Sequence, residues 1–161
     1  MNVCADILKA QLADYNHESC LIYGIGNVGR QDDGLGWAFI DWLEENNICP
    51  KADIARHYQL QLEHADLISH KQRVLFVDAT KAPDVEDIRL EDVAPKMDFS
   101  FSSHAVSIPA IIATCQRCFD KYPKVQLLTM KGYEWELHIG LTKKASRNLN
   151  TAIDFFRNEG L

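Results

Sequence analysis

The feature that most constrains the fold is a run of four consecutive apolar residues, 74–77, that ends directly in Asp78. A strand this uniformly apolar is typical of the centre of a parallel sheet, where helices cover both faces. A second such strand, residues 19–26, runs into a glycine-rich turn. Strand-like and helix-like segments then alternate along the chain. We therefore predict an α/β fold, a three-layer α/β/α sandwich with a mostly parallel sheet.

The expected elements follow from hydrophobic periodicity and from capping signals. An amphipathic helix is expected over residues 3–15, which makes residues 1–18 a helical N-terminal extension of a single domain spanning 1–161. Thr142 is a predicted N-cap, and Pro109 lies near the start of another predicted helix. The remaining helices are expected at 33–46, 63–70, 104–122 and 141–160, and the other strands at 52–60, 73–80, 84–93 (a sheet edge) and 124–132.

Composition and charge disfavour several classes of function. A content of 47% hydrophobic and 25% charged residues suits one packed domain. A formal net charge of -6 disfavours a nucleic-acid partner, because phosphate binding needs clustered Lys and Arg. No apolar run is long enough to span a membrane, and the N-terminal residues do not resemble a signal peptide. The odd number of cysteines, five, indicates free thiols, so we expect a cytoplasmic protein.

The turn after the first strand has three interpretations. Gly24, Gly26 and Gly29 match the dinucleotide fingerprint G-x-G-x-x-G. Asp32 and Asp33 stand close to where a phosphate would lie, which disfavours nucleotide binding. The turn also resembles that of peptidyl-tRNA hydrolases, but their catalytic His is replaced here by these acidic residues. The third interpretation is a metal-based hydrolytic site that includes Asp33. Taken alone, Asp33 would suit the N-cap of the following helix equally well. Asp32 is expected only to cap that helix.

Two further polar residues lie where parallel strands are expected to end or turn. Asp78 closes the apolar strand, and a carboxylate buried there needs a cation, a metal ion or several hydrogen-bond donors. His104 lies at the start of a predicted helix, and neutral imidazole is a common metal ligand. Because the carboxyl ends of parallel strands meet at one edge, we predict that Asp33, Asp78 and His104 form a catalytic metal site. Two carboxylates and one imidazole suit zinc or nickel, and they leave positions for water or substrate.

The order and spacing of these motifs are specific in combination. The motifs are Gly24-x-Gly26-Asn27 with Asp33-Gly34-x-Gly36, then residues 76–79, Ser103-His104, and residues 136–142. Together they resemble the hydrogenase maturation endopeptidases over roughly residues 20–156. The resemblance implies an α/β/α sandwich in which Asp33, Asp78 and His104 bind a metal ion.

The same resemblance implies an activity and a partner. It implies an endopeptidase that removes a short C-terminal peptide from the large subunit of a nickel–iron hydrogenase after nickel insertion. The divalent metal would be nickel supplied by the substrate, with zinc or cadmium as substitutes. The partner would be the large-subunit precursor or another metalloprotein.

The segment after the second predicted strand departs from the family pattern. Many members carry an Asp-Gly-Gly-Thr-like loop there and others His-Gln-Leu, whereas this chain has His57-Tyr58-Gln59-Leu60. Because this loop is associated with substrate recognition, the expected substrate-binding residues are Tyr58 and Gln59, together with Gly26 and Asn27 of the glycine turn. The replacement of the family's His by Tyr58 leaves open a module that binds the tail of a metalloprotein without cleaving it.

Overall fold

The computed structural model describes residues 12–97 and 106–157. The predicted ligand His104 and most of the helix predicted over residues 3–15 lie outside these ranges. Among the described residues, no helix combines the length and the apolarity that crossing a membrane requires. The described elements are η1 (Leu12–Tyr15), β1 (Cys20–Ile25), η2 (Gln31–Gly34), α1 (Leu35–Glu45), β2 (Asp53–His57), α2 (His64–Ser69), β3 (Arg73–Thr80), β4 (Ile88–Asp92), α3 (Ile108–Phe119), β5 (Lys124–Lys131) and α4 (Lys143–Arg157).

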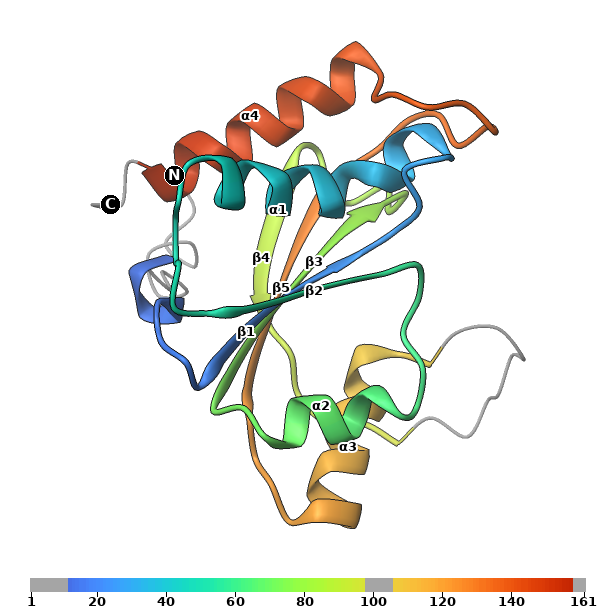
Figure 1. Cartoon of the computed structure of the whole chain (residues 1–161). Helices are drawn as coiled ribbons and strands as arrows, with labels where there is room; N and C mark the ends of the chain where they lie inside the picture. The colour runs from blue at the N-terminus through green and yellow to red at the C-terminus, as the bar shows by residue number, and fades with distance from the viewer. Residues whose placement is uncertain (1–11, 98–105, 158–161) are drawn as a thin grey trace.

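The five strands form one sheet in the order β2-β1-β3-β5-β4. Four strands run parallel, and β4 pairs antiparallel with β5 at the edge, as predicted for residues 84–93. The apolar run 74–77 forms the core of the central strand, β3. The chain leaves β1 through α1 on one face of the sheet and leaves β2 through α2 on the other face (Figure 1). The carboxyl ends of the parallel neighbours β1 and β3 lie side by side, at the edge where α/β sheets usually place their sites.

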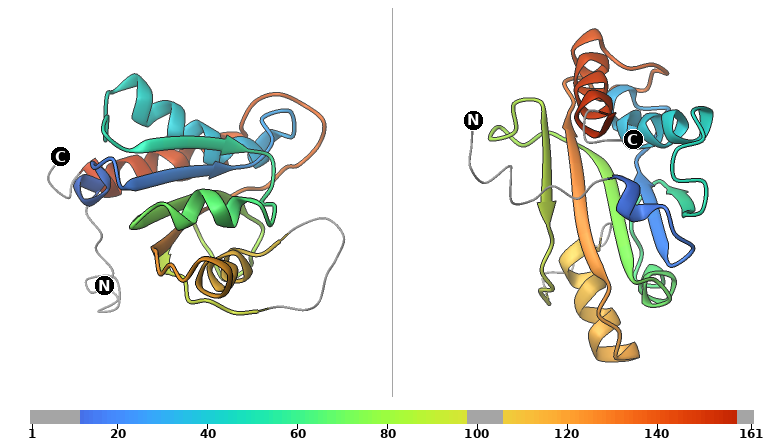
Figure 2. Two further views of the ribbon diagram at one scale, coloured as in Figure 1. Left: turned by 60° about the horizontal axis from the view of Figure 1, so that its bottom comes forward. Right: turned by 90° about the vertical axis from the view of Figure 1, so that its left-hand side faces the viewer.

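Helices cover both faces of the sheet, which confirms the predicted three layers; the views in Figure 2 show the two helical layers on opposite sides. On one face α1 and α4 enclose a core that includes Phe39, Leu75 and Phe156. On the other face α2 and α3 cover a second core that includes Phe76 and Ile111. Because neighbouring residues of a strand point to opposite faces, β3 contributes to both cores. Each large apolar side chain that is fully buried stabilises the fold by about 2 kcal/mol.

Capping side chains set the starts of the two longest helices. Thr142 is the N-cap of α4, as predicted, because its Oγ1 accepts the N–H of Ala145 at 3.2 Å. The predicted start of α3 is wrong: the helix begins at Ile108, four residues later than expected. Ser107 caps this helix, with its Oγ accepting a backbone N–H. A proline in the first turn fits there, because the N–H groups of a first turn have no partner within the helix.

Candidate functional site

A pocket of about 380 Å³ lies at the crevice between the ends of β1 and β3. Asp33 reaches the pocket from the turn that follows β1, and Asp78 reaches it from the end of β3. Two of the three predicted metal ligands therefore share one pocket. The remaining lining residues are Ile25, Arg30, Ala79, Lys81 and Trp135.

The glycine turn places Asp33 through backbone geometry. Gly26 has a φ of +141°, and a Cβ at this position would lie 1.9 Å from the carbonyl oxygen of Asp33. Only glycine fits such a close approach. The N–H of Asn27 donates to this carbonyl oxygen at 3.2 Å and to Oδ2 of the Asp33 carboxylate at 2.9 Å. The turn therefore directs its own amide to Asp33, whereas a nucleotide-binding turn would present such amides to a phosphate.

Asp78 carries the largest electrostatic perturbation in the pocket. Burial raises the pKa of its carboxyl to about 7; the N–H of Ala79, 2.8 Å from Oδ1, lowers this pKa, and the charge of Asp33 raises it. Burial acts in this direction because a charged carboxylate loses hydration. Asp78 therefore exchanges its proton near neutral pH, and a neighbouring cation would favour the carboxylate form.

Asp33 lies in a mixed electrostatic environment. Burial raises the pKa of its carboxyl, whereas the Asn27 N–H and the positive charges of Arg30 and Lys81 lower it. The pocket thus combines two carboxylates with two cationic side chains. Such a combination can hold a cation, accept a proton from water and stabilise negative charge on a substrate.

The pocket carboxylates fit a divalent cation as oxygen ligands, but they are only two of the three predicted ligands. Within residues 12–97 and 106–157, no group of three or more His, Cys, Asp or Glu side chains could hold a metal ion. His104, the third predicted ligand, lies outside those residues. Asp33 and Asp78 retain the donor chemistry that zinc or nickel accepts, and the three-ligand site stays a prediction.

Asp32 has a structural role that differs from the predicted one. The expectation that it caps α1 is wrong, because the N-cap is Gly34 and no side chain caps this helix. The Asp32 side chain is 0% exposed and accepts four hydrogen bonds from the segment after β5. The donors are the N–H of Tyr133 at 2.8 Å, the N–H of Glu134 at 3.1 Å, and the N–H and hydroxyl of Thr142, both at 2.8 Å. A buried carboxylate needs such donors, and this one fastens the β5–α4 segment to the glycine turn.

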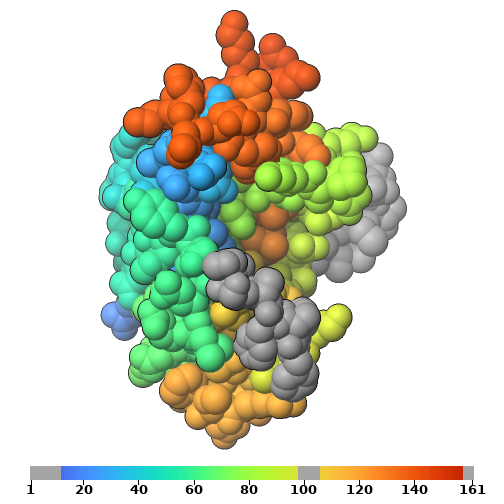
Figure 3. All heavy atoms as spheres, turned by 90° about the vertical axis from the view of Figure 1, so that its right-hand side faces the viewer, coloured from blue at the N-terminus to red at the C-terminus, as the bar shows by residue number. Residues whose placement is uncertain are grey.

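Backbone hydrogen bonds join the same two segments. The N–H of Gln31 donates to the carbonyl of His138 at 2.8 Å, and the N–H of His138 donates to the carbonyl of Gly29 at 3.0 Å. In Figure 3 the segment 132–142, in orange, lies directly on the glycine turn, in blue. Trp135 lies within this segment and lines the pocket.

The predicted substrate loop lies at the same edge of the sheet. The Tyr58 side chain is 65% exposed and stacks on Trp37, with ring centroids 5.4 Å apart. Gln59 is also exposed. The carbonyl of His57 accepts the N–H of Gly26 at 3.0 Å, so the start of this loop is bonded to the glycine turn. The loop therefore presents Tyr58 and Gln59 to solvent beside the turn that carries Asp33.

Five lining residues were not among the site residues expected from the sequence: Ile25 and Ala79, and the cationic or aromatic residues Arg30, Lys81 and Trp135. Lys81 follows Asp78 by three residues at a strand end, and this position could have suggested it. Trp135 shows no such local signal, because it belongs to a segment that hydrogen bonds to Asp32 and to the backbone of the glycine turn hold at the pocket.

Comparison with known proteins gives matches to solved structures only. No protein-family model matches the sequence. No curated protein matches it either. The nickel–iron hydrogenase maturation protease HycI from Thermococcus kodakarensis is 16% identical, with a TM-score of 0.70 that covers 98% of this chain and 97% of that one. HybD from the same organism is 14% identical, with a TM-score of 0.64 over 88% of this chain and 99% of that one.

A bacterial structure shows the same similarity. The hydrogenase maturating endopeptidase HybD from E. coli is 17% identical, with a TM-score of 0.61 over 88% of this chain and 93% of that one. The chain therefore has the fold of the hydrogenase maturation proteases over most or nearly all of its length. This confirms the predicted α/β/α sandwich, and at the level of the fold it confirms the resemblance seen in the motifs.

Proposed function

Because the chain has the fold of the hydrogenase maturation proteases, we propose that it is an endopeptidase of this type. Its substrate is the precursor of a nickel–iron hydrogenase large subunit, from which it removes a C-terminal peptide after nickel insertion, in the cytoplasm. The observation that carries the proposal is the shared pocket of Asp33 and Asp78, at the edge of the sheet where α/β proteins place their chemistry. The matched structures support it through their fold.

The nickel ion belongs to the substrate in this proposal. Asp33, Asp78 and His104 would hold it, with zinc or cadmium as substitutes, and the ion would supply Lewis acidity toward the scissile carbonyl or its attacking water. One of the two carboxylates accepts the proton of that water. Tyr58 and Gln59 contact the precursor near its processing site. Gly26 and Asn27, on the turn that carries Asp33, contact the same part of the precursor.

The direct test is incubation of the purified chain with a nickel-loaded precursor that carries its C-terminal extension. Intact mass spectrometry should show loss of one C-terminal peptide, whereas a nickel-free precursor should stay whole. Asp33→Asn and His104→Ala should each slow cleavage by at least about 10²-fold, the usual scale for removing a group that stabilises the transition state. Asp154→Asn, a change at an exposed residue of α4, is the matched control and should cleave normally.

Two results would contradict the proposal. Tight binding of the precursor without any cleavage would favour the module that binds a metalloprotein tail. A rise in melting temperature with ATP or NAD, together with no effect of the precursor, would favour nucleotide binding. The bond from Asn27 to the Asp33 carboxylate argues against this second outcome.

The exposed loop allows a separate prediction for Gln59. Gln59→Ala should change the free energy of unfolding by no more than about 0.5 kcal/mol, because surface substitutions usually cost little. It should weaken precursor cleavage by about tenfold, the effect of losing one contact of moderate strength. Zinc affinity, measured by calorimetry, should not change.

Gln61→Ala is the control, because Gln61 is exposed in the same loop and is not among the proposed contacts. Equal losses of cleavage in the two variants, or a large loss of stability with unchanged cleavage in Gln59→Ala, would show that Gln59 does not contact the substrate.

A further inference from the structure

Lys81 brings a positive charge to the pocket that the proposed function does not yet use. It lies just beyond β3, and it lines the pocket together with Asp33 and Asp78. Its Nζ lies over the ring of Trp135, 4.8 Å from the ring centroid. A cation over an indole ring is attracted to the negative face of the ring. The ammonium therefore has a preferred place beside the carboxylates.

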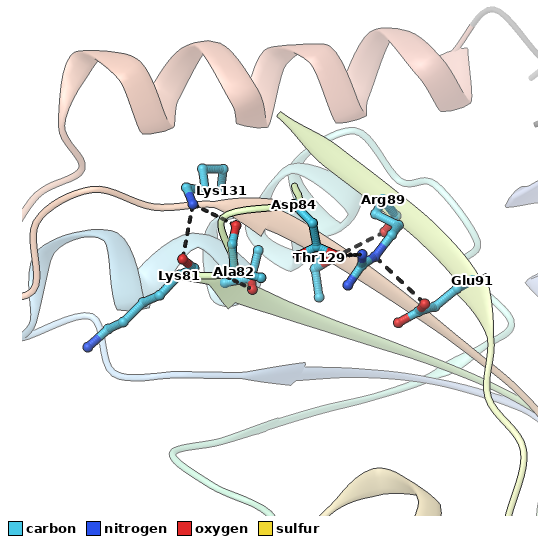
Figure 4. A network of polar contacts seen from close by, with 8 residues as sticks. Lys81, Ala82, Asp84, Arg89, Glu91, Thr129 and Lys131 are labelled. Atoms are coloured by element: carbon cyan, nitrogen blue, oxygen red, sulfur yellow. Dashed lines mark hydrogen bonds and ion pairs between the residues drawn. The ribbon is translucent and has the colours of Figure 1, made fainter. Parts of the chain in front are cut away.

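The backbone of Lys81 is held in place by a second lysine, Lys131. Nζ of Lys131, at the end of β5, donates to the carbonyl oxygens of Lys81 at 3.0 Å and Ala82 at 2.6 Å. The N–H of Ala82 donates to Oγ1 of Thr80 at 3.1 Å. Figure 4 shows these contacts of Lys131, with the Lys81 side chain extending away from them. The ion pair of Arg89 with Asp84, in the loop before β4, lies beside them. A backbone held by Lys131 and a stacked ammonium together reduce the orientations open to Lys81.

We infer that Lys81 is a further catalytic residue of this site: its ammonium stabilises the negative charge that develops on the scissile carbonyl oxygen. The inference rests on the proposed peptidase function. Hydrolysis of a peptide bond places negative charge on the carbonyl oxygen, whichever group activates the water. In the proposed peptidase this charge would form in the pocket that Lys81 lines.

The reaction balances with the groups in the pocket. Water adds to the carbonyl carbon, its proton passes to one of the two carboxylates, and the electron pair of the C=O double bond moves to the oxygen beside Lys81. The pair then returns, the C–N bond breaks, and the proton on the carboxylate is delivered to the leaving nitrogen. Lys81 keeps its proton throughout. The substrate excludes water from the pocket, and this exclusion strengthens the attraction between ammonium and oxyanion.

Lys81 fits this role better than Arg30, the other cation of the pocket. The Lys81 ammonium is located by Trp135, and its backbone is held by Lys131. Preorganisation of this kind is what makes a charged group effective in catalysis, because no energy is then spent on orienting it during the reaction.

The test compares Lys81→Met with Lys144→Met on the nickel-loaded precursor. Lys144 is a matched control, because its Nζ also lies over an aromatic ring, 5.4 Å from the centroid of Tyr133, and it is outside the Asp33 pocket. Lys81→Met should lower kcat by about 10²-fold with KM changed less than about threefold, since the lost interaction forms mainly in the transition state. Lys81→Arg should recover most of the rate, because it keeps the charge and the ring contact. Lys144→Met should behave as the wild type.

A second readout does not depend on cleavage. Calorimetric titration of the precursor-free protein with zinc should show equal or tighter binding in Lys81→Met, because the change removes a positive charge beside two carboxylates. Parallel losses of zinc affinity and kcat would overturn the inference, since Lys81 would then act by supporting the carboxylates. An unchanged kcat, or an effect on KM alone, would also overturn it. A wild-type protein that binds the precursor and never cleaves it would instead overturn the proposed function, and the inference with it.

Discussion

Asp32→Ala is expected to lower the free energy of unfolding by about 3–5 kcal/mol, the cost of removing one partner from a buried charged network. The substitution deletes the acceptor of four hydrogen bonds, and the backbone N–H groups of Tyr133, Glu134 and Thr142 would lose their partner. Thermal unfolding should show a fall in Tm of roughly 10 °C or more for a chain of this size. Asp32→Asn should cost nearly as much, because its amide places donors where acceptors are needed.

The adjacent residue supplies the control. Asp33→Ala removes one hydrogen bond, from Asn27, together with a carboxylate whose pKa burial raises, so its stability should stay within about 1 kcal/mol of the wild type. Limited proteolysis should cut Asp32→Ala, and not Asp33→Ala, within residues 132–142. A stability loss below about 1 kcal/mol in Asp32→Ala would show that the buried carboxylate does not hold this segment.

Asp78→Asn is expected to stabilise the metal-free protein at high pH. The pKa of Asp78 is about 7 in the folded protein and 3.8 without its environment. Because the folded-state pKa is raised, the wild type is most stable while Asp78 is protonated, and it loses stability as pH rises from about 4 to 7. The asparagine variant avoids this loss and can still accept the Ala79 N–H.

The size of this stability difference follows from the shift in the pKa of Asp78. We reduce the expected free energy because the Asp78 side chain is partly exposed to solvent. The stability advantage of Asp78→Asn should be about 2 kcal/mol larger at pH 8 than at pH 5, or roughly 4–8 °C in Tm. Thermal melts at the two pH values, with a chelator present, measure it. Asp154→Asn should show no such pH dependence. A variant that is less stable than the wild type at pH 8 would mean that the Asp78 carboxylate has stabilising partners. The same substitution should abolish cleavage, which would make Asp78 a residue kept for activity at the expense of stability.

The layers of the fold were predictable because they depend on local signals. The apolar run 74–77 required a strand covered on both faces, and the alternation of periodicities required helices between parallel strands. The meeting of Asp33 and Asp78 also followed, because the carboxyl ends of parallel strands share one edge. The start of α3 was misplaced because His104 was taken as the helix start, whereas the capping signal is Ser107 with a proline two residues later.

The remaining parts of the site depend on contacts that no local pattern reveals. Asp32 has the sequence context of a helix cap, yet its partners lie after β5. Trp135 enters the pocket as a result of those contacts. The position of the Lys81 ammonium depends in turn on Trp135 and on Lys131. Each step joins segments that are distant in sequence, so periodicity and turn signals could not supply it.

The hydrogen bonds of Asp32 also bear on how the pocket assembles while the chain is being synthesised. Its hydrogen bonds join residues that are 101 to 110 positions apart in the chain. Closing a loop of this length costs conformational entropy that only contacts across the whole domain can offset. On the ribosome, both pocket carboxylates emerge well before Tyr133 and Thr142. A nascent chain that has folded only β1 to β3 lacks Trp135 and the contacts of Lys131. The pocket therefore gains Trp135 and the contacts of Lys131 only after β5 and the segment that follows it have been synthesised, so the topology sets the order in which the parts of the pocket assemble.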